Sequence, residues 1–234
     1  MFLISSSFVQ ISFGTYNHDP IAEWGTFGVV EPGHFSYPQF IAVSDDDGSI
    51  YVSDFGNKRI QKFSSNGEYI TDWGQSGKQV GNFYNPSGIA VGIDSVFVVD
   101  RDLNRIQKFS LDGEFISTWG AKGTSGGQFL YPNGIAINNG ILYVVDTGNQ
   151  RIQMFSTDGE FISSFGSSGL GEGKFLNVAG IDVDVDGNVY VTDKGNNKIE
   201  KFNADGELIK SFPFYFPSYV FSPEAIAVDN SGDM

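Results

Sequence analysis

The feature that most constrains this sequence is an internal repeat with a period near 46 residues. Five segments align: FSYPQFIAV (35–43), FYNPSGIAV (83–91), FLYPNGIAI (129–137), FLNVAGIDV (175–183) and VFSPEAIAV (220–228). Their central isoleucines are separated by 48, 46, 46 and 45 residues. A fixed period of roughly 20 to 50 residues indicates a repeat architecture in which each copy is one supersecondary unit.

Each copy holds four short apolar segments. In the first copy the IAV run is followed by IYVSD (50–54), then by RIQKF (59–63) and EYITDWG (68–74). Apolar and polar residues that alternate with period 2 predict half-buried strands. Gly or Pro interrupts every stretch, so no window of a dozen residues carries a helical pattern. The sequence therefore predicts an all-β chain, a β-propeller of four-stranded antiparallel blades.

The repeats also predict the domain organisation. Complete copies span 35–74, 83–120, 129–166 and 175–212, and a partial copy spans 220–234. We therefore expect about four complete blades plus partial terminal blades in a propeller covering 15–234. Residues 20–25 (PIAEWG) are typical of a lone fourth strand that closes a ring. If the ring has six blades, about 70 to 80 residues are missing at this period, which favours a truncated chain or fragment.

Every complete copy carries an Asn-Gly or Asp-Gly dipeptide between its third and fourth segments. These are Asn66-Gly67, Asp112-Gly113, Asp158-Gly159 and Asp205-Gly206. Such dipeptides tolerate positive φ at both central positions of a two-residue hairpin loop. We therefore predict type I′ turns at these four places.

Charge and composition exclude several functions. The chain has 28 acidic and 14 basic residues, so its net charge is −14. This charge opposes approach to nucleic acid or to an anionic lipid surface, and we expect no nucleic-acid partner. The absence of cysteine excludes disulfides and thiolate metal sites. No apolar run reaches the roughly 18 residues that span a bilayer, so no membrane span is predicted.

Residues 1–14 (MFLISSSFVQISFG) are apolar and rich in serine, and two interpretations stay open. They are either a leader, the remnant of a secretory signal peptide, or a strand of the fold itself. The segment lacks the basic start and the small-residue cleavage site of a signal peptide. We expect an extracellular or cell-surface location, and a cytoplasmic one stays open.

The repeated residues resemble a known family. The frame F-x-x-P-x-G-I-A-V, then Y-V-x-D-x-G-N-x-R-I-Q-x-F, then D-G-E-F-I-x-x-F/W-G is similar to the NHL repeat over about 35–234. The third copy, residues 129–166, matches almost throughout. The resemblance implies a β-propeller that usually has six blades. It is far less specific for activity, because this fold hosts unrelated functions.

The resemblance also suggests two activities to test against the residues. NHL-type enzymes such as the peptide-amidating lyases place histidines on several blades, whereas this sequence has only His18 and His34, both ahead of the first complete copy. Some NHL domains bind RNA through a basic face, but no basic stripe with interleaved aromatics stands out here. We therefore expect no catalytic residue, metal or cofactor in this chain.

An aspartate ends each second segment, and a basic residue follows five positions later. A ring of four carboxylates suggests a metal or substrate site, but a carboxylate beside its own cation pins a loop and neutralises itself. We therefore interpret these residues as structural pairs: Asp54 with Arg59, Asp100 with Arg105, Asp146 with Arg151 and Asp193 with Lys198.

The fourth copy contains an acidic run, Asp182-x-Asp184-x-Asp186-Gly187, that resembles the opening of a calcium loop. The run lacks the flanking helices of an EF-hand, so we predict no metal site there. Asp182 is unusual because the other copies carry alanine at its position. Its carboxylate needs a partner if it is buried. Alternatively, it faces a water-filled central channel.

Recognition is expected where the copies differ. Loops from fourth to first strands and from second to third strands lie on one face of a propeller, and variation there encodes binding unless it is neutral drift. The candidate binding residues are Phe55, Arg101, Asp102, Thr147, Lys194, Phe214, Tyr215 and Tyr219. The sequence favours a non-enzymatic scaffold that binds a protein or small-molecule ligand. The alternatives are a propeller enzyme (a metal-dependent lyase or hydrolase) with active-site residues missing from this chain, and an RNA-binding domain, which the net charge disfavours.

Overall fold

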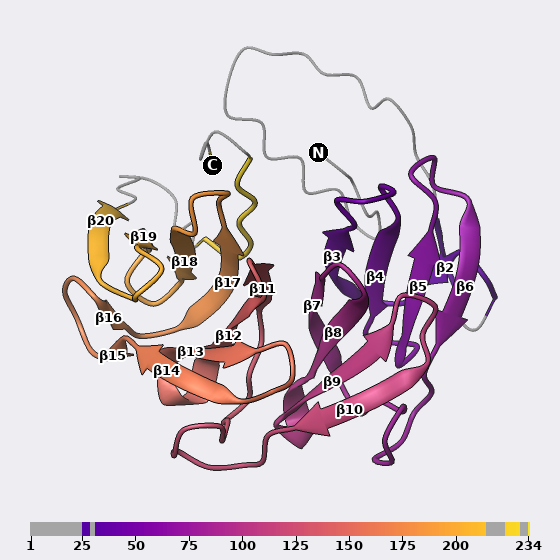
Figure 1. Cartoon of the computed structure of the whole chain (residues 1–234), viewed down its shortest axis with the longest axis horizontal. Helices are drawn as coiled ribbons and strands as arrows, with labels where there is room; N and C mark the ends of the chain where they lie inside the picture. The colour runs from indigo at the N-terminus through magenta and orange to yellow at the C-terminus, as the bar shows by residue number, and fades with distance from the viewer. Residues whose placement is uncertain (1–24, 29–30, 214–222, 230–233) are drawn as a thin grey trace.

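The structure, a computed structural model, describes residues 25–28, 31–213, 223–229 and 234. Four antiparallel sheets of four strands each are arranged in an arc around a common axis (Figure 1). Each sheet takes its strands in chain order, as consecutive hairpins do. The predicted all-β propeller architecture is confirmed.

The four sheets are the blades that the repeats predict. The first blade is β3 (Pro38–Val43), β4 (Ile50–Asp54), β5 (Arg59–Phe63) and β6 (Tyr69–Trp73). The second is β7 (Pro86–Val91), β8 (Ser95–Asp100), β9 (Arg105–Ser110) and β10 (Phe115–Trp119). The third is β11 (Ile135–Asn138), β12 (Ile141–Asp146), β13 (Arg151–Ser156) and β14 (Phe161–Phe165). The fourth is β17 (Val178–Val183), β18 (Val189–Asp193), β19 (Lys198–Phe202) and β20 (Leu208–Pro213).

A short closed loop precedes every blade. Its two ends pair in parallel, as β1 (Thr26–Phe27) with β2 (His34–Phe35) and as β15 (Ser167–Ser168) with β16 (Lys174–Phe175). Single parallel bridges hold the two middle loops, Ser76 with Phe83 and Lys122 with Phe129. Two 3-10 turns, η1 (Arg101–Leu103) and η2 (Thr147–Asn149), connect second to third strands. No helix in the described ranges is long and apolar enough to cross a membrane.

The predicted type I′ turns are wrong. Only the glycine of each dipeptide has positive φ, at 81°, 90°, 85° and 82° for Gly67, Gly113, Gly159 and Gly206. In the first blade Gly67 N–H donates to Ser64 O at 2.9 Å, and Ser64 N–H donates to Glu68 O at 2.8 Å. The ladder shifts register beside this loop, which is the three-residue type I turn closed by a glycine bulge. Ser64 Oγ also accepts the Asn66 and Glu68 N–H groups, which favours this geometry.

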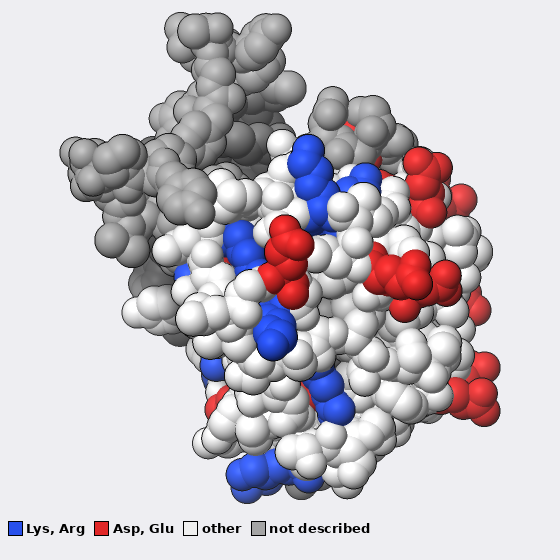
Figure 2. Space-filling view, turned by 90° about the vertical axis from the view of Figure 1, so that its left-hand side faces the viewer, with Lys and Arg blue, Asp and Glu red and all other residues white. Residues whose placement is uncertain are grey.

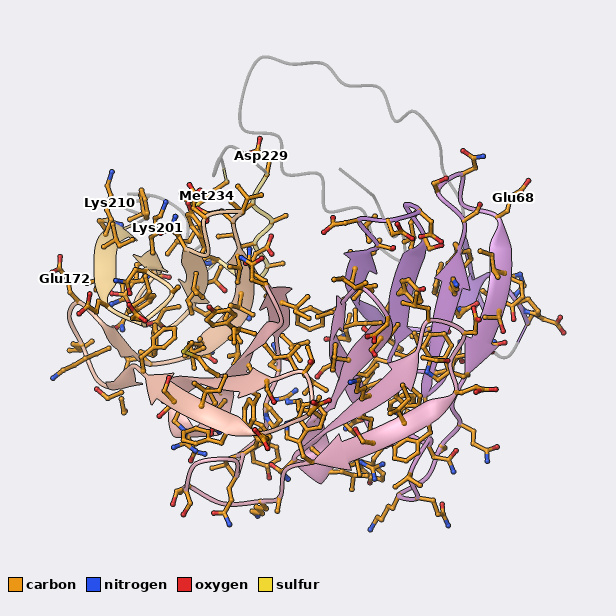
Figure 3. All side chains as sticks on the ribbon, viewed as in Figure 1. Glu68, Glu172, Lys201, Lys210, Asp229 and Met234 are labelled. Atoms are coloured by element: carbon orange, nitrogen blue, oxygen red, sulfur yellow. The ribbon has the colours of Figure 1, made fainter. Side chains whose placement is uncertain are left out.

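Aromatic side chains fill the space between neighbouring blades (Figure 3). Trp119 of the second blade lies with its ring centroid 6.3 Å from that of Phe155 in the third. A Cβ on Gly159 would lie 2.6 Å from the Trp119 ring, so only glycine fits the turn that receives this side chain. Trp73 and Phe165 occupy the equivalent positions in the first and third blades. The repeated glycine and aromatic residue therefore act as one contact between blades.

The first strands of the blades lie innermost and touch one another. Gly88 N–H in β7 donates to Asn133 O at 2.8 Å, and Asn133 Nδ2 donates to Ala179 O in β17 at 3.2 Å. Residues 223–229 continue this series beside the fourth blade, where Glu224 O accepts the Thr192 hydroxyl at 3.1 Å. The described part of the fifth copy, residues 223–229, therefore lies next to β17 but forms no strand within the described residues.

Candidate functional site

One side of the propeller gathers the loops that vary between copies. We call it the loop face. It carries the connections from second to third strands and the closed loops between blades, because Pro38 pairs with Asp54 and Asp54 with Arg59 at the same end of the first blade. The type I turns lie on the opposite face. Their exposed carboxylates are Glu68, Asp112, Glu114, Asp158, Glu160, Asp205 and Glu207.

A buried carboxylate organises the loop face in the first blade. Asp54 is fully buried and accepts the Ser36 N–H at 2.7 Å, Arg59 Nε at 3.0 Å and Gln61 Nε2 at 3.0 Å. Asn57 Nδ2 donates to the same carboxylate at 2.8 Å. Arg59 in turn donates to two carbonyl oxygens of the closed loop that precedes the blade. The aspartate therefore ties both loops of the blade together.

The second and third blades repeat this arrangement. Arg105 lies 3.1 Å from Asp100, and Arg151 lies 2.8 Å from Asp146; both aspartates are fully buried. Burial raises the pKa of Asp100, while the Asn85 N–H and Arg105 act in the opposite direction. Each of these carboxylates accepts several donors, so they hold loops and leave no oxygen open to a ligand.

The fourth blade departs from the predicted pairing of Asp193 with Lys198. The Lys198 ammonium lies 2.9 Å from Glu200 Oε1 and donates to Gly171 O instead. Asp193 is held by main-chain N–H groups and by Asn196 Nδ2, which donates at 2.6 Å. The physical reason is a double change in this copy, where a lysine and a glutamate replace the arginine and glutamine of the others. A lysine presents a single point charge, and Glu200 attracts it.

In the acidic run of the fourth copy, Asp184 accepts hydrogen bonds from its own hairpin. Asp184 accepts the Asp186 N–H at 3.1 Å, the Asn188 N–H at 2.8 Å and the Tyr190 hydroxyl at 3.0 Å. Asp182 is half-buried in β17, and its Oδ2 accepts the Val228 N–H at 2.7 Å. Among the described residues no three His, Cys, Asp or Glu side chains form a group that could hold a metal. Asp182 instead joins the fifth copy to the fourth blade.

Replacing Asp182 with alanine, the residue of the other copies, is expected to free the Val228 amide. Loss of the 2.7 Å acceptor should speed its hydrogen exchange by about 10- to 150-fold, since a hydrogen bond to a charged group contributes roughly 1.5–3 kcal/mol. Exchange measured by NMR checks this result. Asp186→Ala, which removes an exposed carboxylate nearby, is the matched control. Unchanged exchange at Val228 in the Asp182 variant would contradict this role.

The described candidate binding residues all lie on the loop face but do not form one cluster. Phe55 is half-buried, with the Lys58 ammonium 4.1 Å from its ring centroid. Arg101 is exposed, and Asp102 accepts a hydrogen bond from Asn85 Nδ2. Thr147 Oγ1 donates to Val178 O at 3.1 Å, and Lys194 pairs with Glu224 at 2.7 Å. Phe214, Tyr215 and Tyr219 lie outside the described residues.

A cavity of about 320 Å³ opens where the first strands converge on the loop face. We call it the axial cavity; its lining residues are Pro38, Gln39, Phe40, Asn133, Glu224 and Ala225. They come from the first, third and fifth copies, which are far apart in the sequence. Of the candidate residues, Lys194 contacts this lining through its ion pair with Glu224.

Three exposed tyrosines on the loop face were not predicted from the sequence. Tyr37, Tyr84 and Tyr131 expose 66%, 46% and 45% of their surface area, respectively. Tyr37 and Tyr131 have φ of 49° and 50°, a left-handed conformation that is uncommon for a residue with a side chain. Pro38 and Asn133 line the axial cavity; Tyr37 is next to Pro38 in the sequence, and Tyr131 lies two residues before Asn133. The Tyr-Pro dipeptide in these two copies was the available signal.

Charged side chains on the side formed by the fourth blade are mixed. Lys and Arg residues form a broken band that acidic and uncharged side chains interrupt, and further Asp and Glu side chains gather toward one edge (Figure 2). Two of the bases nearby are held by carboxylates, Lys198 by Glu200 and Lys201 by Asp184 at 3.5 Å. The described residues on this side form no continuous basic surface of the kind that binds a phosphate backbone.

Comparison with known proteins agrees with this architecture. A family model described as a 6-bladed beta-propeller matches residues 126–224, and the NHL repeat model matches residues 35–63. The chain is 37% identical over 71 residues to peptidyl-glycine alpha-amidating monooxygenase of Mus musculus and 35% identical over 71 residues to the Rattus norvegicus protein. These matches cover 26% of this chain and 7% of either relative.

Solved structures with the same fold include two lyases. Virginiamycin B lyase from Staphylococcus aureus, solved as a catalytically inactive variant with quinupristin, gives a TM-score of 0.60 at 19% identity, covering 80% of this chain and 58% of that one. A streptogramin B lyase gives 0.60 at 21% identity, covering 79% and 56%. Kuenenia stuttgartiensis hydrazine synthase gives 0.60 at 15% identity, covering 82% and 52%. This chain therefore spans little more than half of these structures.

Together the blades and the matches define the class of protein as a β-propeller. Within that class the NHL repeat model, the family that the sequence resembles, matches residues 35–63.

Proposed function

We propose that this chain is a non-enzymatic NHL-repeat scaffold that binds a protein or small-molecule ligand on its loop face. The observation that carries the proposal is the axial cavity, which residues from three separate copies line. Ligand sites favour concave surfaces at which a few polar groups converge among apolar ones. Gln39, Asn133 and Glu224 supply the polar groups here, and Pro38 and Phe40 the apolar ones.

The surroundings of the axial cavity support the same function. Tyr37 and Tyr131, close in sequence to the lining residues Pro38 and Asn133, are exposed, and exposed aromatic side chains commonly anchor interfaces. Their left-handed backbone conformation costs free energy, and such strain often accompanies functional sites. The oxygens of the repeated aspartates, in contrast, accept hydrogen bonds from the loops. Binding is therefore assigned to the axial cavity and the exposed tyrosines, and architecture to the repeated aspartates.

The proposal has three further parts. An arrangement of six blades is supported by the 6-bladed family model over residues 126–224. A partner other than nucleic acid is supported by the net charge of −14 and by the interrupted basic band. An extracellular or cell-surface location completes the proposal. Fractionation of the native host cells tests it, because recovery of the protein only in the cytosol would contradict it.

A small-molecule fragment library is the probe for this function. Fragments that bind the wild-type chain should bind the Tyr37→Ala/Gln39→Ala/Tyr131→Ala variant at least about tenfold more weakly, because aromatic anchors contribute most to such sites. Titration calorimetry measures this change. The matched control, Asp112→Asn/Asp158→Asn/Asp205→Asn, alters the opposite face and keeps its turn glycines. Weaker binding in the control with unchanged binding in the first variant would place the site on the opposite face and contradict the proposal.

A second candidate is a propeller enzyme, and the local match to peptidyl-glycine alpha-amidating monooxygenase favours it. Two of the solved relatives are also named as lyases. In the described part of this chain His34 is the one histidine, and its carbonyl oxygen accepts hydrogen bonds from Arg59 and Gln61. Turnover of quinupristin by the purified chain, abolished by a chelator, would favour the enzyme over the scaffold.

A further inference from the structure

The fourth blade contains a buried glutamate at a position where the other three carry glutamine. These residues are Gln61, Gln107, Gln153 and Glu200, and all four are fully buried. In the third blade Gln153 Oε1 accepts the Gly127 N–H at 3.0 Å. Its Nε2 donates to Asp146 Oδ2 at 2.9 Å and to Gln128 O at 2.7 Å. At this position the glutamine therefore accepts a hydrogen bond with its amide oxygen and donates hydrogen bonds with its amide nitrogen.

Glu200 sits in the same orientation as these glutamines. Its Oε1 accepts the Gly173 N–H at 2.8 Å, as Gln153 Oε1 accepts that of Gly127. Glu200 Oε2 then takes the place of the amide nitrogen, and it is buried without a hydrogen-bond partner among the described residues. An ionised oxygen can only accept hydrogen bonds, whereas this place in the other blades requires a donor.

The charges around Glu200 favour one extra proton. Asp193 and Glu200 are two fully buried carboxylates that act on each other, and the Lys198 ammonium lies 2.9 Å from Glu200 Oε1. These are the charged groups that β18 and β19 present to Glu200; Ser211 of β20 lies opposite it in the ladder. The closed loop presents the Gly173 N–H, and Glu172, labelled in Figure 3, points outward at the rim. One negative charge is therefore left over in a buried place, which is costly.

Among the described residues Glu200, and not Asp193, has a carboxylate oxygen without a hydrogen-bond partner. Asp193 already accepts the N–H groups of Leu176, Asn177, Gly195 and Asn196 as well as Asn196 Nδ2. Burial raises the pKa of Glu200, with Lys198 and the Gly173 N–H acting against it and Asp193 reinforcing it. Protonated Oε2 provides the missing donor.

We propose that Glu200 keeps its proton in the folded protein and donates it from Oε2 toward the Asp193 carboxylate, so that the closed loop 167–175 is latched to the fourth blade in a pH-dependent way. Lys174 O is the counterpart of Gln128 O, and it already accepts Asn196 Nδ2 at 3.2 Å. Loss of the proton leaves two facing carboxylates, whose repulsion weakens the latch, while the Gly173 N–H still donates to Oε1. The other three blades carry an amide here and lack this sensitivity.

The pH dependence follows from the direction of the pKa change. A carboxyl whose folded pKa lies above its unfolded value of about 4.3 contributes stability below that value and loses it as pH rises through the folded pKa. Glu200→Gln replaces the carboxyl with the amide of the sibling blades. The unfolding equilibrium constant of the wild-type chain, divided by that of the variant, should therefore rise by about tenfold between pH 5 and pH 8. Urea unfolding at both pH values measures this ratio.

A variant that introduces a glutamate into another blade provides the matched test. Gln153→Glu introduces the carboxyl into the third blade, and its unfolding constant relative to wild type should rise with pH in the same direction. A ratio independent of pH in either variant overturns the proposal. The 13C carboxyl signal of Glu200, assigned by its loss in Glu200→Gln, gives an independent readout in the folded chain. A protonated carboxyl at pH 6 supports the latch, and an ionised one at pH 5 overturns it.

Discussion

Replacing Asp146 with alanine is expected to lower the free energy of unfolding by about 3–5 kcal/mol, because removing one partner of a buried ion pair leaves an uncompensated charge. Asp146 is fully buried and accepts Leu130 N–H at 2.8 Å, Asn149 Nδ2 at 2.8 Å, Arg151 Nε at 2.8 Å and Gln153 Nε2 at 2.9 Å. All of these donors lose their acceptor together. Urea unfolding monitored by tryptophan fluorescence measures the change.

The control for this prediction is Asp158→Ala in the same blade. Asp158 also pairs with a base, Lys108 at 3.4 Å, but its side chain is 85% exposed. Exposed ion pairs contribute between 0 and about 1 kcal/mol, so this variant should unfold close to the wild type. Equal effects of the two substitutions on stability would contradict the structural role of Asp146. A stable Asp146 variant that has lost ligand binding would show that Asp146 serves a ligand and not the fold.

Trp119→Ala is expected to cost about 3–5 kcal/mol, the range for truncating a large aromatic side chain in a packed interface. The indole lies between Phe97 and Phe155, each with ring centroids 6.3 Å away, and it covers the turn at Gly159. Its loss leaves a cavity between the second and third blades. Thermal and urea unfolding measure the cost.

Trp119→Phe separates packing from polarity at the same position. Phe165 fills the equivalent place in the third blade, and the Trp119 Nε1 atom is buried without a hydrogen-bond partner among the described residues. Phenylalanine removes this unpaired group while keeping most of the contact, so the cost should stay below about 1.5 kcal/mol. Ile116→Ala, on the exposed side of β10, is the surface control. A phenylalanine variant as unstable as the alanine variant would contradict this account.

The repeat predicted the blades because one set of contacts recurs in each copy. Segments such as VFVVD (96–100) and LYVVD (142–146) became buried second strands, β8 and β12, since a fixed period repeats the same packing demands. The aspartates at their ends lie beside Arg105 and Arg151 for the same reason. The strands, and the aspartate–arginine pairs of the first three copies, were therefore readable from the sequence.

Features that depend on local alternatives or on closure of the arc were not readable. An Asn-Gly or Asp-Gly pair fits both a type I′ turn and a type I turn with a glycine bulge, and the preceding serine or asparagine, such as Ser64, decided between them. Lys198 changed partner because Glu200 stands two residues away, a difference visible in KIEKF (198–202) but not interpreted. The axial cavity joins Gln39, Asn133 and Glu224, whose proximity no local pattern encodes.

The measurement that tests the central claim most directly is amide chemical-shift mapping of the tightest-binding fragment on the 15N-labelled wild-type chain. The account predicts that the largest shifts fall on Gln39, Asn133 and Glu224 around the axial cavity. The turn glycines of the opposite face, Gly113 and Gly159, should stay unshifted. Shifts that cluster on those glycines, with none around the axial cavity, would contradict the assignment of binding to the loop face.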